Sequence, residues 1–136
     1  PGEKPFALLL LDVDNFKQTN DRYGHPKGDA VLRCLGENLS GLFRRDDVVG
    51  RVGGDEFLMM MPGAGGEQAV GRARKIAQEM CRSVSVQCGV DVSGSIGVVL
   101  SKPGACAYEE LLRRADSALY AAKAAGKGCY RVYGGA

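Results

Sequence analysis

The chain has 136 residues, 45% hydrophobic and 25% charged, a composition typical of one folded domain with a substantial core. Its formal net charge of +2 argues against a general nucleic-acid-binding protein, which would gather a surplus of basic residues on one face. The longest apolar run, residues 6–11, is too short to span a membrane, so we expect no membrane contact by this domain.

The cysteines are scattered along the chain and form no Cys-x-x-Cys pair; they are Cys34, Cys81, Cys88, Cys106 and Cys129. Because His25 is the only histidine, no zinc cluster is expected. This pattern favours reduced thiols and a cytoplasmic domain. A membrane anchor elsewhere in a longer protein stays an open alternative.

The first predicted strand is the continuous apolar run of residues 6–11, which is followed by Asp12-Val13-Asp14. An apolar run without alternation is typical of a strand covered on both faces. Carboxylates just beyond such a strand lie where open α/β sheets bind ligands. The alternative is that Asp12 and Asp14 only end the strand in solvent.

Residues 15–28 are polar and contain His25-Pro26 and two glycines, so we expect mainly loop with about one helical turn. Apolar residues then recur at helical spacing and predict a helix. Its apolar face consists of Ala30, Val31, Cys34, Leu35, Leu39, Leu42 and Phe43. The charged residues 44–47 end this helix.

Gly53-Gly54 separates two predicted strands, residues 47–52 and 56–61. A Gly-Gly pair between apolar runs predicts a two-residue hairpin turn with positive φ angles. It also leaves bare backbone beside the carboxylates of Asp55 and Glu56. Magnesium commonly binds one or two carboxylates plus phosphate, so this turn is a candidate site for a metal-bound phosphate.

The rest of the chain predicts, in order, a loop at 62–66, a helix at 67–83, a short strand at 84–87, a strand at 92–101, a helix at 108–125 and a strand at 129–133. The resulting order β-α-β-β-α-β-α-β predicts an α+β fold with a ferredoxin-like sheet and helices packed on it. Such a fold serves many functions, so the function has to be read from the site.

Several stretches point to one family; they are Asp12-Val13-Asp14-Asn15-Phe16-Lys17, Asn20-Asp21, Gly24-His25-Pro26-Lys27-Gly28-Asp29, Gly53-Gly54-Asp55-Glu56-Phe57, Ser95-Ile96-Gly97-Val98 and Ala115-Asp116-Ser117-Ala118-Leu119-Tyr120-Ala121-Ala122-Lys123. In this order and spacing they resemble the GGDEF family, the diguanylate cyclases of bacterial signalling. The resemblance implies that residues 1–136 form one GGDEF domain with a nucleotide-cyclase-type sheet. It also implies an enzyme that condenses two GTP molecules into cyclic di-GMP and releases pyrophosphate.

Each domain of this family holds one GTP, so the resemblance implies a homodimer, with two Mg²⁺ or Mn²⁺ ions in each active site. Asp12 and Asp55 match the metal-binding acids, and Val13 matches the residue whose backbone carbonyl is a ligand. Asp55 and Glu56 match the catalytic pair of acids. Glu56 either binds the second metal or accepts the proton of the attacking 3′-hydroxyl, and an ordinary strand-edge acid is the alternative.

Asn20 and Asp29 match the residues that bind guanine. A carboxylate can accept hydrogen bonds from both N1–H and N2–H₂ of guanine, whereas adenine places an acceptor at N1. An unpaired buried polar group costs about 1–3 kcal/mol, so Asp29 favours GTP over ATP. The alternative for Asp29 is an acid at a helix start.

Lys123 and Lys127 match basic residues that contact phosphate. Lys127 stands where arginine is common in the family, and it keeps the charge but loses the bidentate fork. The alternative is that both lysines only complement a helix C-terminus. The backbone amides expected to contact phosphate oxygens are those of Asn15, Phe16, Lys17, Gly53 and Gly54.

Arg44-x-x-Asp47 lies at the spacing that the family uses for an inhibitory product site. Arginine can stack on guanine and bind its O6 and N7 edge, while the acid accepts the guanine donors. A basic residue from another surface completes such a site, and the candidates are Arg72, Arg74 and Lys75.

The chain lacks the Asp-x-Leu-Thr-Gly-Leu-x-Asn-Arg-like segment that usually precedes the first strand, and it has no starting methionine. We therefore expect an N-terminally truncated fragment of a larger signalling protein with a sensory or regulatory domain. Two alternatives stay open. One is a catalytically idle module that binds GTP or cyclic di-GMP. The other is a related nucleotide cyclase acting on ATP or mixed substrates, against which Asp29 argues.

Overall fold

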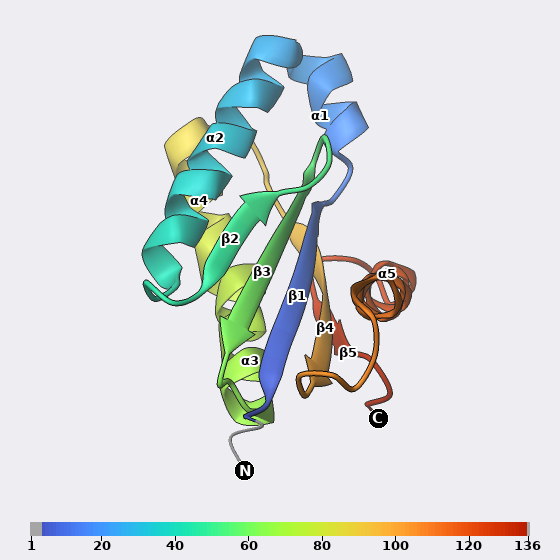
Figure 1. Cartoon of the computed structure of the whole chain (residues 1–136). Helices are drawn as coiled ribbons and strands as arrows, with labels where there is room; N and C mark the ends of the chain where they lie inside the picture. The colour runs from blue at the N-terminus through green and yellow to red at the C-terminus, as the bar shows by residue number, and fades with distance from the viewer. Residues whose placement is uncertain (1–3, 136) are drawn as a thin grey trace.

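The computed structural model of the chain describes residues 4–135 (Figure 1). The elements in chain order are β1 (Phe6–Val13), α1 (Phe16–Tyr23), α2 (His25–Leu42), β2 (Val48–Arg51), β3 (Glu56–Pro62), α3 (Gly66–Lys75), the π-helical turn η1 (Ile76–Met80), α4 (Cys81–Cys88), β4 (Gly94–Ser101), α5 (Tyr108–Ala124) and β5 (Tyr130–Val132). No helix within the described residues is long and apolar enough to cross a bilayer. All five cysteines carry free thiols.

Strand β1 lies at the centre of a five-stranded mixed sheet whose order is β2-β3-β1-β4-β5. It pairs antiparallel with both β3 and β4, while β5 adds to β4 in parallel. Leu8 and Leu9 point to opposite faces of the sheet and are both fully buried. The prediction of a first strand covered on both faces is therefore confirmed.

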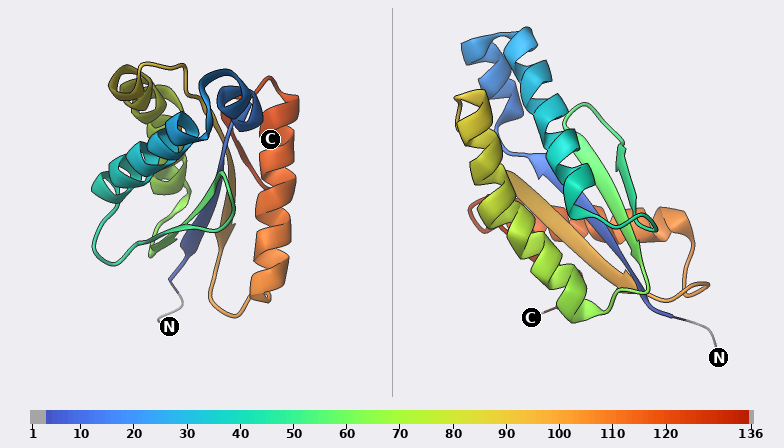
Figure 2. Two further views of the ribbon diagram at one scale, coloured as in Figure 1. Left: turned by 90° about the horizontal axis from the view of Figure 1, so that it is seen from above. Right: turned by 90° about the vertical axis from the view of Figure 1, so that its left-hand side faces the viewer.

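Helices cover the two faces of the sheet unequally (Figure 2). On one face, α2, α3, η1 and α4 bury a large core that includes Leu9, Leu35 and Ile76. On the other face, α5 alone packs against a smaller cluster that includes Leu8 and Leu119. This mixed sheet with helices confirms the predicted α+β fold class.

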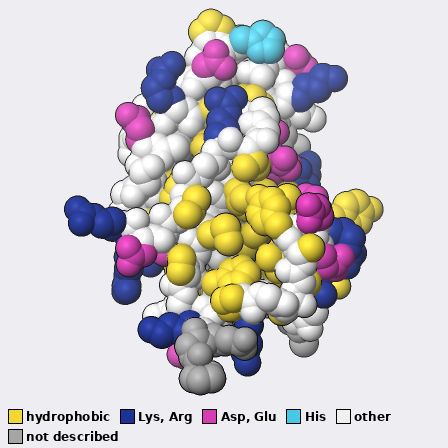
Figure 3. Space-filling model, viewed as in Figure 1, with side chains coloured by type: hydrophobic (Ala, Val, Ile, Leu, Met, Phe, Trp, Pro, Cys, Tyr) yellow, Lys and Arg dark blue, Asp and Glu magenta, His cyan; other side chains and the backbone are white. Residues whose placement is uncertain are grey.

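Helix α5 approaches the sheet closely because β4 has a glycine beneath it. A Cβ atom at Gly97 would lie 2.3 Å from the carbonyl oxygen of Ala115 and 2.6 Å from the amide nitrogen of Leu119. Beyond the edge of α5, hydrophobic side chains are visible on the same face of the molecule (Figure 3). The partly buried hydrophobic residues that pack against the smaller cluster beneath α5, the one with Leu8 and Leu119, are Phe6, Met60, Cys106 and Leu112.

Two predicted segments are wrong. Residues 15–28 are not mainly loop but form α1 and the start of α2, in which Pro26 occupies the first turn, where its missing N–H is tolerated. The sequence of α1 lacks the apolar stripe that marks a helix, and accordingly no residue of α1 is fully buried. Residues 84–87 are not a strand but part of α4, which continues α3 through η1 and ends at Gly89 with a φ of 72°.

The hairpin between β2 and β3 exists, but its turn differs from the prediction. The amide of Val52 donates to the carbonyl of Glu56 at 3.0 Å, which leaves residues 53–55 between them rather than two residues. Neither Gly53 nor Gly54 has a positive φ angle. The longer loop does not need the left-handed conformation that two-residue hairpin turns require.

Candidate functional site

The end of β1 and the start of β3 bring the predicted acidic residues together. Asp12 is the register partner of Glu56, and the amide of Val13 donates to the carbonyl of Asp55 at 3.1 Å. Residues 12 and 55 thus meet at one end of the sheet, as expected. Asp12 and Asp14 are only 8% and 6% exposed, so the alternative that they end the strand in solvent is wrong.

Asp12 is a buried carboxylate with two different oxygens. Its Oδ2 accepts a hydrogen bond from the ammonium of Lys123 and forms an ion pair with it. Its buried Oδ1 has no hydrogen-bond partner within the described residues. Burial raises the pKa of Asp12, and the neighbouring charge of Asp55 adds to this, so that together they outweigh the lowering effect of Lys123. Burial alone would lower the pKa of Lys123, but Asp12 raises it above its usual value.

Glu56 is half-buried beside the same group of carboxylates. Its pKa is raised first by burial and then by the negative charges of Asp12, Asp116 and Asp55. Asp116 lies on α5 and was not among the predicted site residues, although its stretch belonged to the family resemblance. Three carboxylates thus raise the pKa of Glu56 and Lys123 alone opposes them, and this excess of negative charge favours a bound cation.

These residues fit a magnesium ion that shares its ligands with a substrate. No group of three or more His, Cys, Asp or Glu side chains within residues 4–135 is arranged to enclose a metal. Magnesium rarely needs such a cage, because it takes one or two carboxylates and fills its octahedron with water and phosphate oxygens. The unpaired Oδ1 of Asp12 is an oxygen that such an ion would satisfy.

The start of α1 presents free backbone amides to the same end of the sheet. Asn15 has a left-handed conformation, with a φ of 55°, and its side chain makes no capping hydrogen bond to the helix. The amides of Phe16 and Lys17 are therefore available to an anion, as is usual at an uncapped helix start. Lys127 reaches this turn, since its Nζ lies 2.7 Å from Oδ1 of Asn15.

Asn20 and Asp29 come from the two helices that follow β1. The Oδ1 atom of Asn20 is buried without a hydrogen-bond partner in the described chain, and a Cβ at Gly28 would lie only 1.8 Å from it. Asp29 is the next residue and is exposed. It lies in α2 beyond the first turn, and α2 has no side-chain cap, so the alternative of a helix-start acid finds no support.

The hairpin tip is held by the side chain of Arg51. Its guanidinium donates to the carbonyl of Gly53 at 3.2 Å and to that of Gly54 at 3.0 and 2.7 Å. A Cβ at Gly54 would meet nothing within 4 Å, whereas one at Gly53 would lie 3.0 Å from Glu56 Oε1. Arg51 therefore fixes the tip in position, and the space beside Gly54 stays open while Glu56 lies beside Gly53.

Arg44 and Asp47 line a concavity of about 340 Å³ at the end of β3 that lies away from Asp55 and Glu56. They close a turn, since the amide of Arg44 donates to Asp47 Oδ2 at 2.8 Å. Arg72 and Lys75 line the same concavity, while Arg74 lies 3.2 Å from the hydroxyl of Tyr130 instead. Of the three candidate basic residues, Arg72 and Lys75 thus share this surface with Arg44.

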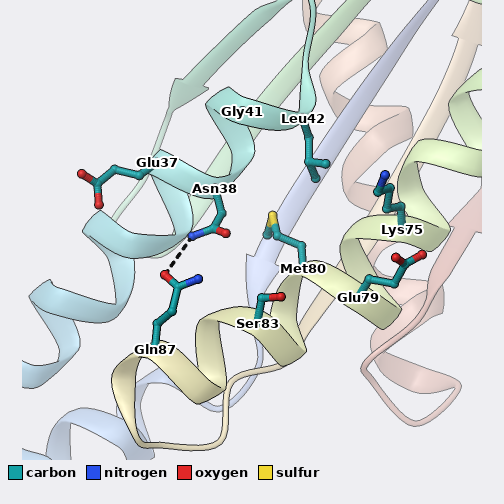
Figure 4. A pocket seen from close by; sticks show the side chains of 9 residues that line it. All are labelled: Glu37, Asn38, Gly41, Leu42, Lys75, Glu79, Met80, Ser83 and Gln87. Carbon is teal, nitrogen blue, oxygen red and sulfur yellow. Dashed lines mark hydrogen bonds between the residues drawn. The ribbon is translucent and has the colours of Figure 1, made fainter.

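A further pocket of about 530 Å³ lies between α2 and the α3–η1–α4 helix (Figure 4). Its walls are joined by a hydrogen bond of 3.4 Å from Asn38 to Gln87, and Lys75 lines both this pocket and the Arg44 concavity. Apart from Lys75, none of the predicted site residues lines it. It is therefore separate from the acidic end of β1.

Comparison with known proteins places the whole domain in one group. A family model described as "Diguanylate cyclase, GGDEF domain" matches residues 2–129. The chain is 39% identical over 122 residues to the diguanylate cyclase DgcM of Escherichia coli (strain K12), covering 90% of this chain and 29% of that protein. It is 34% identical over 127 residues to the probable diguanylate cyclase DgcT of the same strain, covering 90% of this chain and 28% of that protein. The chain thus spans less than a third of the length of these relatives.

Solved structures show the same architecture. The active GGEEF domain of a diguanylate cyclase from Vibrio cholerae superposes with a TM-score of 0.86 at 32% identity, covering 96% of this chain and 83% of that one. The GGDEF domain of DgcB from Caulobacter crescentus, in complex with c-di-GMP, superposes with a TM-score of 0.85 at 28% identity, covering 96% of this chain and 79% of that one. With the family match over residues 2–129, these likenesses show that the chain belongs to the GGDEF domain family of diguanylate cyclases.

Proposed function

We propose that residues 1–136 form a catalytic GGDEF domain that condenses two GTP molecules into cyclic di-GMP. The observation that carries this proposal is Asp12, a buried carboxylate with an unpaired oxygen beside Asp55 and an internal cation, Lys123. Such a group is costly to keep unless a ligand satisfies it. Two relatives of the chain are named as a diguanylate cyclase and a probable diguanylate cyclase, which supports the same activity.

The site would hold one GTP along the line from α2 to the hairpin. Asp29 and Asn20 would bind the guanine, and the unpaired Oδ1 of Asn20 suits one of the guanine donors. The amides at the start of α1 and the side chains of Lys123 and Lys127 would bind the phosphates. Asp12, Asp55 and the carbonyl of Val13 would hold Mg²⁺ or Mn²⁺, two ions per site, which would neutralise charge at the α-phosphate.

In the reaction, the 3′-hydroxyl of one GTP attacks the α-phosphorus of the other. The new O–P bond forms as the bond to the β-phosphate breaks, and pyrophosphate leaves. Glu56 would accept the hydroxyl proton, since its raised pKa makes it a better base than an ordinary carboxylate. A second, identical step closes the ring.

Each domain supplies half of the reacting pair, so the active species would be a homodimer. The Arg44–Asp47 turn, with Arg72 and Lys75, would bind the cyclic di-GMP product and inhibit the enzyme. We further propose that the chain is part of a longer cytoplasmic signalling protein whose sensory or regulatory domain controls the pairing of the two sites.

The test is incubation of the protein with GTP and magnesium, with products read by mass spectrometry. The wild type should form cyclic di-GMP, and Asp55→Ala should lower turnover by more than about a hundredfold. Glu109→Gln, an exposed acid in the first turn of α5, is the matched control and should keep wild-type turnover. Undiminished product formation by Asp55→Ala would overturn the proposed metal site.

A regulatory module that binds cyclic di-GMP without turnover is the second candidate. The observation that favours it is the Arg44 concavity, which is formed by residues independent of the acidic end of β1. Calorimetry with cyclic di-GMP, run beside the GTP assay, separates the two functions. Binding of cyclic di-GMP together with no turnover, by this chain and by the full-length protein, would favour the module.

A further inference from the structure

Asp14 is a buried carboxylate that no part of the proposed reaction uses. It is 6% exposed and accepts three hydrogen bonds. Its Oδ1 accepts from the hydroxyl of Ser95 at 2.6 Å. Its Oδ2 accepts from the hydroxyl of Ser93 at 2.7 Å and from the backbone amide of Gly128 at 2.9 Å. The last of these bonds crosses from the end of β1 to the loop between α5 and β5.

This loop carries Lys127 in a conformation that needs support. Gly126, Lys127 and Gly128 have φ angles of 118°, 66° and 61°, all in the region that side chains with a Cβ disfavour. Lys127 is one of only two non-glycine residues with a positive φ within residues 4–135, and the other is Asn15. The amides of Gly126 and Lys127 donate to the carbonyls of Lys123 and Ala122 at 3.2 Å each and tie the loop to α5, while the amide of Gly128 donates to Asp14 instead.

Residues 14–15 and 127–128 are joined by two adjacent hydrogen bonds. Asp14 accepts from the amide of Gly128, and Asn15 accepts from Nζ of Lys127 at 2.7 Å. The first bond fixes the backbone next to Lys127, and the second holds its ammonium at Asn15, the residue that precedes the amides at the start of α1. The lysine ammonium thus lies next to the start of α1, and a positive charge beside backbone donors suits a phosphate oxygen.

We propose that Asp14 is a positioning residue for the nucleotide phosphates, and that it acts by holding the Gly128 amide so that Lys127 is presented beside the α1 amides. The inference deepens the proposed function and rests on its phosphate site. Asp14 itself touches no phosphate, because both of its oxygens are used by hydrogen bonds within the protein. Its effect on ligand binding must therefore pass through Lys127.

The chemistry of the three donors predicts which substitutions are tolerated. The Gly128 amide can only donate, so it needs an acceptor at residue 14. The Ser95 hydroxyl can turn and accept instead. Asp14→Asn can thus keep its carbonyl on Gly128 and Ser93 and direct its NH₂ to Ser95, whereas Asp14→Ala loses all three hydrogen bonds.

The experiment is a double-mutant cycle between Asp14→Ala and Lys127→Ala. The probe is 3′-deoxy-GTP with magnesium, which lacks the attacking hydroxyl and reports binding by calorimetry. Asp14→Ala should weaken binding about tenfold in the wild-type background and by less than about twofold in the Lys127→Ala background. Asp14→Asn should restore most of the affinity, and its Gly128 amide should stay protected from hydrogen exchange.

Ser85→Ala is the control for a merely structural effect. Its hydroxyl lies within hydrogen-bond distance of the carbonyls of Cys81 and Val92 and accepts from the amide of Val92, and it makes no hydrogen bond to Asp14 or Lys127. It should lower the melting temperature while leaving the affinity for 3′-deoxy-GTP unchanged. An equal loss of affinity from Asp14→Ala with and without Lys127, or no binding of the probe by the wild type, would overturn the inference. Should Asp14→Ala fail to fold, wild-type affinity in Asp14→Asn combined with rapid exchange at Gly128 would do the same.

The outcomes keep this inference apart from the proposed function. Coupled binding of 3′-deoxy-GTP without any GTP turnover would support the role of Asp14 and contradict the cyclase. Turnover of GTP without coupling between Asp14 and Lys127 would do the reverse.

Discussion

Glu56 is a residue whose negative charge, when the carboxyl is ionised, lowers the stability of the folded protein. Its pKa is raised above the ordinary value of 4.5 by burial and by the negative charges of Asp12, Asp116 and Asp55. A carboxyl whose pKa is raised by folding contributes stability below the pKa of the unfolded chain. That contribution is lost as the pH rises through the folded pKa. At neutral pH, in the absence of divalent ions, Glu56 therefore opposes folding.

Glu56→Gln should accordingly raise the melting temperature at pH 7 in the presence of a chelator. We expect a gain of about 4 °C or less, because the group is partly exposed and solvent screens its charge. The gain should vanish below pH 4.5, where the wild-type carboxyl is also protonated. Glu109→Gln, which lies outside the carboxylate group, should show no such pH-dependent gain. A thermal denaturation series from pH 4 to 8 measures both, and a lower melting temperature at pH 7 would contradict the assignment.

Arg72 and Arg74 differ by two positions and serve different surfaces. Arg72 lines the Arg44 concavity and lies 4.9 Å above the ring of Phe43, whereas Arg74 lies over Tyr130. Arg72→Ala should weaken cyclic di-GMP binding by about tenfold or more, since a charge-assisted contact is worth about 1.5–3 kcal/mol. Arg74→Ala is the matched control and should bind normally by calorimetry. Equal losses in both variants would show that the ligand does not use this concavity.

Among the elements, β4 and α5 depend on a single glycine. The space above Gly97 is filled by backbone atoms of α5, which a rotamer change cannot move away. Gly97→Ala must therefore displace the helix that carries Lys123 and Asp116. We expect a loss of stability of about 1–3 kcal/mol, as for other overpacked cores, together with a loss of turnover.

Gly71→Ala, in α3, provides the contrast. Nothing lies within 4 Å of a Cβ at this position, and α3 is regular there. Alanine should stabilise the protein by about 0.4–1 kcal/mol because it restricts the unfolded chain. Urea denaturation of the two variants measures both changes in the free energy of unfolding. Wild-type stability in Gly97→Ala would show that α5 can shift on the sheet without loss of stability.

At the scale of the whole molecule, the sequence predicted the parts that have strong local patterns. The apolar run of β1, the stripe of α5 and the hairpin around Gly53 were all recognisable, and so was the meeting of Asp12 with Asp55. Helix α1 was missed because its sequence has no apolar stripe, which is also why none of its residues is fully buried. The residues 84–87 were read as a strand because valines alternate there, and only the packing of α4 against α2 overrides that preference.

The candidate site shows the same division. Family motifs identified Asp12, Asp55 and Lys123, but they did not show that Lys123 binds Asp12 directly. They also gave no role to Asp14, whose three donors come from β4 and from the loop after α5. Contacts between residues more than seventy positions apart carry no local signal. They require the folded sheet.

The ion pair between Asp12 and Lys123 gives the domain an internal counter-ion. A metal that takes Asp12 leaves the lysine without a partner, and a triphosphate that takes the lysine leaves the carboxylate without one. Together the two ligands satisfy both groups, so each should increase the affinity for the other by the same factor. The protein would then bind the complex of metal and nucleotide more tightly than it binds the free metal or the uncomplexed nucleotide.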